Sequence, residues 1–172
     1  GLGTFMGGQV SDRLAARHPR VLSWLPAFGL GAALPLYLLA FYQSDFRAAF
    51  AILLVAPVLH YIYLAPTFAL AQSVAPPRMR ATAAAGLILV INLIGYGLGP
   101  PFLGMAADYF ANHQLAGHDL TLAACRGIEE GACAAARASG LRSAMMVTVC
   151  VLAWAVAHFL LAGRTLARDR VG

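Results

Sequence analysis

The residues best suited to chemistry are a few polar side chains set in long apolar runs. His60, Tyr63 and Thr67 recur at the spacing i, i+3, i+7, which places them on one face of a helix. Asn92 and Tyr96 are four residues apart and share a helix face in the same way. These side chains can hydrogen-bond a polar solute or one another, and an imidazole can also exchange a proton near neutral pH. The pattern therefore indicates either a solute-contacting path or a set of interhelical hydrogen bonds.

Four apolar runs contain or flank these residues, and each is long enough to cross a bilayer, which takes about 20 residues. The runs are residues 21–42, 46–73, 82–106 and 143–163, and residues 1–10 look like the end of a further span. The chain of 172 residues is 11% charged, whereas soluble domains carry about 25% charged residues. We therefore predict an all-α membrane protein, a bundle of four complete transmembrane helices plus the end of a fifth.

The connections between the runs differ in charge, and arginine supplies every formal positive charge because the sequence contains no lysine. Residues 12–20, residues 76–81 and the segment after Gly163 together hold eight arginines and two acids. The remaining connections, around Arg47 and over residues 107–142, hold four arginines and five acids. The positive-inside rule places the arginine-rich set in the cytoplasm. We expect a multi-pass protein of a bacterial inner (plasma) membrane with a cytoplasmic C-terminus and an extracytoplasmic loop over 107–142.

Two cysteines, Cys125 and Cys133, lie in that long connection. An oxidising compartment would allow a disulfide between them. The spacing fits two free thiols equally well. Zinc binding together with His113 or His118 is a third option, which no CxxC-type spacing supports.

The first connection carries a motif, because the residues from Gly8 to Arg17 read G-x-x-x-D-R-x-A-x-R. It resembles the signature loop of the major facilitator superfamily of transporters, G-x-x-x-D-R-x-G-R-[RK], with Ala15 in place of the second glycine. Gly8 would let a neighbouring helix approach closely, and Asp12 would accept bonds from helix N-terminal amides. Arg13 and Arg17 would hold acidic or carbonyl partners at the interface between the two halves of such a transporter. An ordinary basic loop is the alternative.

A glycine pattern, G-x8-G-x3-G-P-x3-G, runs through the third apolar run. Its members, candidates for helix packing, are Gly86, Gly95, Gly99, Pro100 and Gly104. The pattern is similar to a GP motif of drug-exporting members of the superfamily. It also matches generic small-xxx-small packing, in which helix backbones approach closely in lipid.

Further motifs resemble the Spinster-like branch of the superfamily. Residues 75–83 read A-P-P-R-M-R-A-T-A, residues 92–100 read N-L-I-G-Y-G-L-G-P, and residues 104–108 read G-M-A-A-D. In that branch a P-x-x-R-A-T-A segment opens the eleventh span, followed by N-L-I-G-x-G-x-G-P and G-x-x-x-D, and S-G-L-R-S-A at residues 139–144 is similar to the start of its last span. The resemblance covers essentially the whole chain. It implies that residues 1–172 are a C-terminal fragment of a twelve-helix fold, with spans nine to twelve complete.

The resemblance also implies roles for the polar residues. Its second run would line the central cavity, so the candidate substrate-pathway residues are His60, Tyr63, Thr67, Asn92 and Tyr96. The candidate cytoplasmic gating residues are Gly8, Asp12, Arg13, Arg17, Arg78 and Arg80. No charged residue lies near the middle of a run, which favours an amphipathic or lipid-like substrate over an ion clamped by a buried charge.

Other function classes lack their motifs. There is no G-x-S-x-G or HExxH, and the absence of lysine excludes a Walker A motif from this chain. The net charge of +5 reflects arginines between apolar runs rather than a nucleic-acid-binding face. We therefore predict a secondary active or facilitative transporter, not an enzyme, with no cofactor or metal. Its partners would be the lipid bilayer, the missing N-terminal helices and a small-molecule substrate. A non-transporting scaffold or receptor, or a membrane lipid-modifying enzyme, is the alternative.

Overall fold

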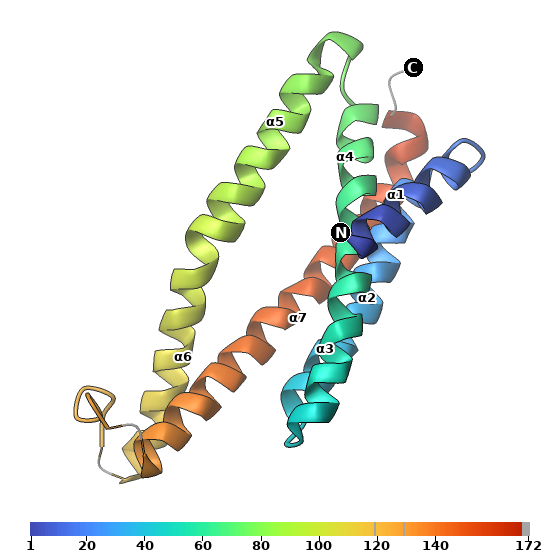
Figure 1. The fold of residues 1–172 in the computed structure, drawn as a ribbon. Helices are drawn as coiled ribbons and strands as arrows, with labels where there is room; N and C mark the ends of the chain where they lie inside the picture. The colour runs from blue at the N-terminus through green and yellow to red at the C-terminus, as the bar shows by residue number, and fades with distance from the viewer. Residues whose placement is uncertain (119, 129, 170–172) are drawn as a thin grey trace. The chain divides into compact units, whose positions relative to one another are not determined.

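The computed structural model describes residues 1–118, 120–128 and 130–169, which are helical almost throughout (Figure 1). The elements are α1 (Leu2–Ala15), α2 (Val21–Tyr42), α3 (Phe46–His60), η1 (Tyr61–Tyr63), α4 (Leu64–Ser73), η2 (Pro77–Met79), α5 (Arg80–Val90), η3 (Ile91–Leu98), α6 (Gly99–Leu115), η4 (Ala116–His118) and α7 (Gly131–Asp169). Here η3 is a π-helix, and the other η elements are single 3-10 turns. The prediction of an all-α chain is confirmed.

Four helical stretches of the described chain are long and apolar enough to cross a membrane. They are Val21–Tyr42, Phe46–Ser73, Pro77–Leu115 and Gly131–Leu166. The first two coincide with the predicted runs. The last two extend well beyond the predicted runs 82–106 and 143–163, because hydropathy reports the part of a helix that suits lipid and not the point where the helix ends.

The long connection over residues 107–142 was expected to be a loop, and that prediction is wrong over most of its length. Helix α6 continues to Leu115, and α7 begins at Gly131. The first turns of α7 read G-A-C-A-A-A-R-A, and alanine has the highest helix propensity of all residues. Polar and alanine-rich sequence therefore extends both helices past the apolar runs.

The motif segment in the first connection is also more helical than expected. Residues Gly8 to Ala15 belong to α1, and only residues 16–20 form the connection to α2. No proline or further glycine interrupts the chain between Gly8 and Ala15, so the helix continues past the apolar part of its sequence.

The connection between α2 and α3 is short and is closed by an N-terminal cap. The side chain of Asp45 accepts hydrogen bonds from the backbone N–H groups of Arg47 and Ala48, each at 3.2 Å. A carboxylate at this position satisfies two of the amides that a helix leaves unpaired and complements the positive end of the helix dipole. The cap explains why α3 begins at Phe46.

The chain forms two compact units. The first comprises residues 1–90 together with the chain from Cys150 onward, and the second comprises residues 91–149. In the first unit, α1 packs on α2, α4 and the 3-10 turn η1, and α2 packs on α3. The second unit contains η3, α6, the disulfide and the first half of α7.

Glycines control the packing of α1 in the first unit. A Cβ atom at Gly3 would overlap the carbonyl oxygen of Val58, and one at Gly7 would overlap the carbonyl oxygen of Ile62. Gly29 of α2 also lies against Ile62, whose Cβ would be 3.1 Å from a Cβ at Gly29. The buried Ile62 side chain, in the middle of η1, is therefore held by glycine-bearing faces of two other helices.

The second unit has a small core at the end where α6 and α7 meet. Its buried residues are Ala111, Leu115, Cys125, Cys133 and Ala136. A Cβ at Gly140 would lie 2.6 Å from the carbonyl oxygen of Ala107 and 2.8 Å from the Cβ of Ala111. Glycine at position 140 is thus what lets α7 approach α6 this closely.

Candidate functional site

The candidate site in the first unit is an aromatic cluster around His60. The centroid of the imidazole lies 5.8 Å from that of Tyr37, 5.5 Å from that of Tyr61 and 5.6 Å from that of Tyr63. The His60 Nδ1 atom is buried and has no hydrogen-bond partner within the described parts of the chain. Buried polar atoms of proteins nearly always have a partner, so this nitrogen calls for a water, a solute or a group from outside the chain.

The cluster lies where the second span is interrupted. Helix α3 ends at His60, the 3-10 turn η1 follows, and α4 resumes at Leu64. Pro66 has no N–H to donate to the carbonyl of Ile62, which an α-helix would require. That carbonyl oxygen faces Gly7 of α1, where the missing side chain leaves room for it. The interruption is therefore set by a proline in one helix and accommodated by a glycine in another.

Of the predicted pathway residues in this span, the structure brings His60 and Tyr63 together. The third, Thr67, donates its hydroxyl hydrogen to the carbonyl oxygen of Tyr63 at 2.6 Å. This bond back to the preceding turn uses the donor of Thr67 and leaves its oxygen only as an acceptor. A substrate could therefore receive no hydrogen bond from Thr67 unless this bond broke.

Tyr37, which sequence reasoning missed, contributes a third helix element to the cluster. It belongs to α2, which the sequence analysis did not include among the pathway elements. The sequence feature that could have predicted Tyr37 as a site residue is the one that predicted Tyr63, namely a tyrosine within an otherwise apolar run. What could not be seen in the sequence is that α2 packs its Tyr37 edge-on against the imidazole.

The other two predicted pathway residues lie in the second unit. Asn92 and Tyr96 both belong to the π-helix η3, and Tyr96 is 70% exposed. In a π-helix the hydrogen bonds run from i to i+5, and such segments occur often at functional sites. Both predicted groups of pathway residues thus coincide with a departure from regular α-helix, one in each unit.

The gating residues are arranged differently from the prediction in one respect. A Cβ at Gly8 would lie 3.6 Å from the Cβ of Ala65, which is ordinary contact distance. The close helix approach expected at Gly8 is instead at Gly3 and Gly7. The signal for it was present as Gly3-x-x-x-Gly7, a small-xxx-small pattern in an apolar segment.

The charged members of the gating group are all solvent-accessible in the described chain. Asp12 and Arg13 are exposed on the last turns of α1, and Arg17 is exposed just after it. Arg78 in η2 and Arg80 at the start of α5 are also exposed. Their role in gating stays a prediction.

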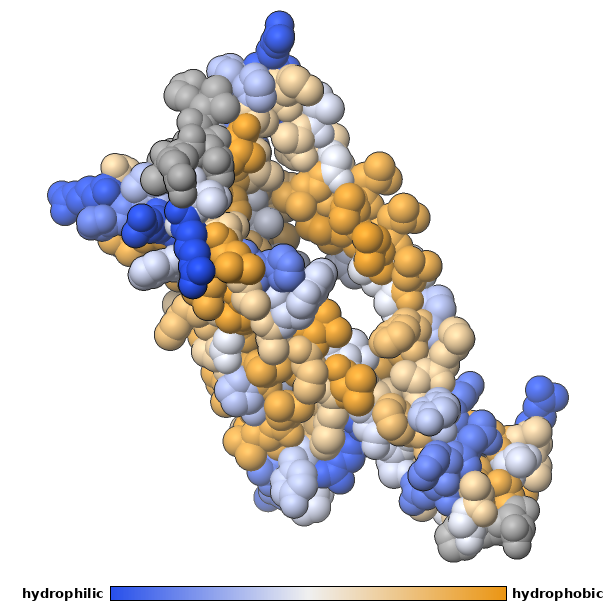
Figure 2. All heavy atoms as spheres, turned by 180° about the vertical axis from the view of Figure 1, so that it is seen from behind, coloured by the Kyte–Doolittle hydropathy of each residue, from blue (hydrophilic) through white to orange (hydrophobic). Residues whose placement is uncertain are grey.

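The glycines predicted to pack helices face open space within the described chain. A Cβ placed at Gly86, Gly95, Gly99 or Gly104 would meet no described atom within 4 Å. No residue in the apolar window of Pro77–Leu115 is buried. Figure 2 shows apolar side chains over much of the visible face. The packing role of these glycines and of Pro100 stays a prediction.

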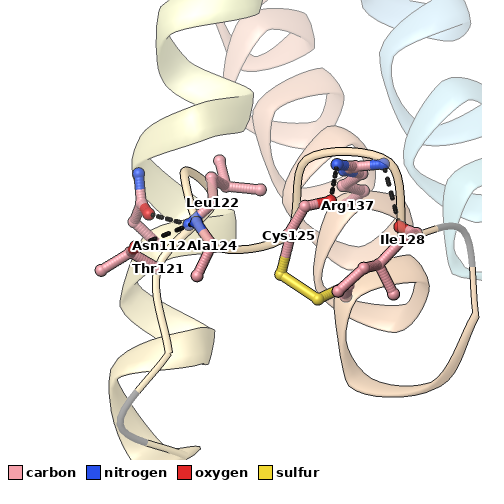
Figure 3. The surroundings of a disulfide bond; sticks show 8 residues. Asn112, Thr121, Leu122, Ala124, Cys125, Ile128 and Arg137 are labelled. Carbon is pink, nitrogen blue, oxygen red and sulfur yellow. Dashed lines mark hydrogen bonds between the residues drawn. A yellow bond between two sulfur atoms is a disulfide. The ribbon is translucent and has the colours of Figure 1, made fainter.

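Cys125 and Cys133, whose pairing the sequence left open, are joined by a disulfide (Figure 3). Their Cα atoms are 5.6 Å apart, within the normal range for a disulfide. The Arg137 guanidinium donates hydrogen bonds to the carbonyl oxygens of Cys125 at 2.7 Å and Ile128 at 3.3 Å. The backbone N–H of Leu122 donates to Asn112 Oδ1 at 2.9 Å, which ties the same segment to α6.

The disulfide bears on the zinc site that the sequence analysis considered, in which both cysteines would be ligands. Both sulfurs are used in the bond, so they are not available as thiolate ligands. In the described residues no group of three His, Cys, Asp or Glu side chains could hold a metal ion. The zinc alternative therefore has no support in this geometry, and the side chain of His118 lies outside the described part.

Asp108, the acid that closes the Spinster-like motif, lines a pocket of about 350 Å³ in the second unit. Arg126 and Arg137 line the same pocket. The motif acid thus lines the same pocket as Arg126, from the segment between the two cysteines, and Arg137 of α7.

Comparisons with known proteins show what the chain is similar to. No protein-family model matches the chain. An MFS-type efflux pump of Mycolicibacterium smegmatis (strain ATCC 700084 / mc(2)155) is 36% identical over 107 residues, which cover 62% of this chain and 25% of the pump. A bacterial homolog of the human lysosomal transporter Spinster, solved inward-facing and unoccupied, is 36% identical with a TM-score of 0.86, over 99% of this chain and 38% of that one. By sequence and by fold, the chain is similar to part of a Spinster-like transporter of the major facilitator superfamily.

The chain also matches an inward-facing and occupied structure of a bacterial Spinster homolog, at 34% identity and a TM-score of 0.86. That match covers 99% of this chain and 39% of the other, so the chain spans about two fifths of the solved structures and a quarter of the efflux pump. The family resemblance found in the sequence is confirmed, and the chain is part of an integral, multi-pass membrane protein. The proteins to which it is similar are transporters.

Proposed function

We propose that the protein containing this Spinster-like chain is a secondary transporter that moves a small amphipathic or lipid-like molecule by alternating access. The observation that carries the proposal is the match over 99% of the chain, at a TM-score of 0.86, to a transporter solved with its site both empty and occupied. Residues 1–172 would supply spans nine to twelve and the end of span eight. The protein would lie in a plasma membrane with the segment after Gly163 in the cytoplasm.

The substrate pathway would pass the interrupted part of the second span. Transporters of this kind build their sites from broken helices near the middle of the membrane. Here the rings of Tyr37 and Tyr63 offer apolar and edge contacts, and the His60 Nδ1 atom offers the polar contact that it lacks within the described chain. Tyrosine rings with their hydroxyls and one imidazole suit a molecule that is largely apolar with a small polar part.

The π-helix with Asn92 and Tyr96 would form a second part of the same pathway. Gating would use the exposed charges of the α1 motif, Asp12, Arg13 and Arg17, and those of Arg78 and Arg80. In the inward-closed state these charges would contact the other half of the transporter, and they would separate when the half-transporters rock apart.

A flux assay tests the proposal. The full-length protein would be reconstituted in proteoliposomes, and uptake of labelled single-chain amphiphiles would be followed with and without a proton gradient. We expect saturable uptake above that of protein-free liposomes, and we expect Asp12→Arg to stall uptake while leaving the amount of inserted protein unchanged. A correctly inserted protein that moves no member of the panel would favour the scaffold or receptor alternative.

A further inference from the structure

A basic pocket lies between α2 and the C-terminal half of α7, within the first unit and apart from the aromatic cluster. It has a volume of about 300 Å³. The residues that line it are Arg20, Trp24, Leu160, Gly163 and Arg164. Neither the transport proposal nor the family motifs make use of it.

The helix spacing explains how the pocket forms. Arg20 and Trp24 are four residues apart on one side of the contact, and Leu160 and Arg164 are four apart on the other, so each pair shares a helix face. A Cβ at Gly163 would lie 2.8 Å from the Trp24 Nε1 atom, so only glycine leaves room for the indole there. The tryptophan and the two arginines therefore all line the pocket, with the indole 55% exposed.

A hydrogen bond fixes the two helices beside the pocket. The hydroxyl of Ser23, which is fully buried, donates to the carbonyl oxygen of Phe159. Ser23 adjoins Trp24, and Phe159 adjoins Leu160. This buried interhelical contact holds the helices that carry Trp24 and Leu160, and Arg20 lies in the turn directly before α2.

The pocket lies at the end of both apolar runs, where a membrane gives way to water. Arg20 immediately precedes the run 21–42, and Arg164 immediately follows the run 143–163. Phospholipid phosphates lie at this depth. Arginine presents a fork of donors that matches phosphate oxygens, and an indole N–H can only donate. We propose that this pocket binds the phosphate headgroup of an anionic phospholipid.

The surface that continues from the pocket favours a lipid over free phosphate. Phe28 follows Arg20 and Trp24 at the next i+4 position of α2 and is 69% exposed. On α7, Leu160 and Leu161 are 46% and 52% exposed. A charged pocket at the interface followed by an apolar stripe toward the membrane interior matches the two parts of a phospholipid, and free phosphate would use only the first.

Lipid titration of the full-length protein tests the proposal. Purified protein in detergent would be titrated with phosphatidylglycerol or phosphatidylcholine, and bound lipid would be counted by native mass spectrometry. We expect tighter retention of phosphatidylglycerol, and we expect Arg20→Gln and Arg164→Gln each to weaken it about five-fold, since a basic residue near an anionic lipid surface contributes about 1 kcal/mol. The double variant should lose about 25-fold if the two contributions add.

The controls separate this site from general charge attraction. Arg47→Gln removes an exposed arginine in the first turn of α3, which follows the far end of α2, and should leave retention unchanged. Arg20→Lys with Arg164→Lys keeps the charge but loses the planar fork, and should fall between the wild type and the double glutamine variant. Unchanged retention in the double glutamine variant would overturn the proposal, as would equal retention of phosphatidylcholine.

Competition with inorganic phosphate tests whether the pocket binds a phospholipid headgroup or free phosphate. Millimolar phosphate should displace little phosphatidylglycerol, because it lacks the acyl contacts. Complete displacement would assign the pocket to free phosphate and overturn the lipid proposal. The readout is bound lipid and not flux, so an absence of transport would leave this result standing.

Discussion

The His60 imidazole is held by three aromatic rings yet has a buried nitrogen without a partner in the described chain. Leaving a buried donor or acceptor unsatisfied costs about 1–3 kcal/mol. Tyr61 and Tyr63 are its neighbours in sequence, so their rings follow from the local turn, but Tyr37 comes from another helix. An arrangement in which packing surrounds a histidine without satisfying it fits a group that meets a partner from outside, either a substrate or the other half of the transporter.

The substitution His60→Phe separates these two partners. If the partner is the substrate, we expect uptake at low substrate concentration to fall about two- to ten-fold, since one hydrogen bond contributes about 0.5–1.5 kcal/mol. The thermal midpoint of the substrate-free protein should then stay the same or rise, because an unsatisfied polar atom has been removed.

His158→Phe is the matched control for that experiment. His158 has its Nδ1 atom 2.9 Å from the carbonyl oxygen of Trp154, within its own helix, so its loss should leave uptake unchanged. If His60→Phe lowered the thermal midpoint and left uptake intact, the nitrogen would serve an interhelical hydrogen bond and the pathway role would be lost.

At the scale of elements, the interruption in the second span depends on how α1 packs against it. Pro66 frees the carbonyl of Ile62, and Gly7 of α1 gives that oxygen its space. A turn that is tightened to 3-10 geometry in mid-span is a place where a helix can bend. The contact with α1 therefore couples the motif-bearing helix to the interrupted span that carries His60.

Replacing Gly7 tests this coupling, and Gly8 supplies the control. A Cβ at Gly7 would overlap the Ile62 carbonyl, whereas a Cβ at Gly8 would reach Ala65 at 3.6 Å. We expect Gly7→Ala to destabilise the protein by about 1–3 kcal/mol, as overpacking does. Gly8→Ala should be neutral or slightly stabilising, because alanine is the better helix former. Thermal unfolding of the full-length protein in detergent measures both, and equal midpoints for the two variants would contradict the assigned contact.

These elements show which features of the structure can be predicted from the sequence. The bounds of α2 and of the α3–α4 span follow from hydropathy, and the i, i+3 spacing brings His60 to Tyr63. The 3-10 and π segments could not be predicted, because they depend on which helix packs against them. Pro66 and the Gly3-x-x-x-Gly7 pattern were visible, but the sequence does not say that they meet. The ends of α6 and α7 were missed because alanine-rich polar sequence continues a helix outside lipid.

At the scale of the whole molecule, the chain leaves most of its apolar surface uncovered. In the apolar windows of the described spans, 33% of the Val21–Tyr42 window is buried but none of the Pro77–Leu115 window. Lipid and further helices would cover these faces, which agrees with a chain that spans about two fifths of the transporters that it matches in structure. From the positive-inside rule we predict that the arginine-rich ends of the spans face the cytoplasm.

Cysteine labelling in intact cells tests that orientation. Single cysteines at Arg17 and Arg80 should react with a membrane-impermeant maleimide only after the cells are opened, because the positive-inside rule places both connections in the cytoplasm. Cysteines at Arg47 and Arg126 should react in intact cells, since both lie in the connections with fewer net positive charges. Blocking Cys150 by Cys150→Ser removes the free thiol, and Cys125 and Cys133 are already joined. Labelling of Arg17→Cys and Arg80→Cys from opposite sides would require an odd number of crossings between α1 and α5, which is incompatible with the two spans that the structure places there.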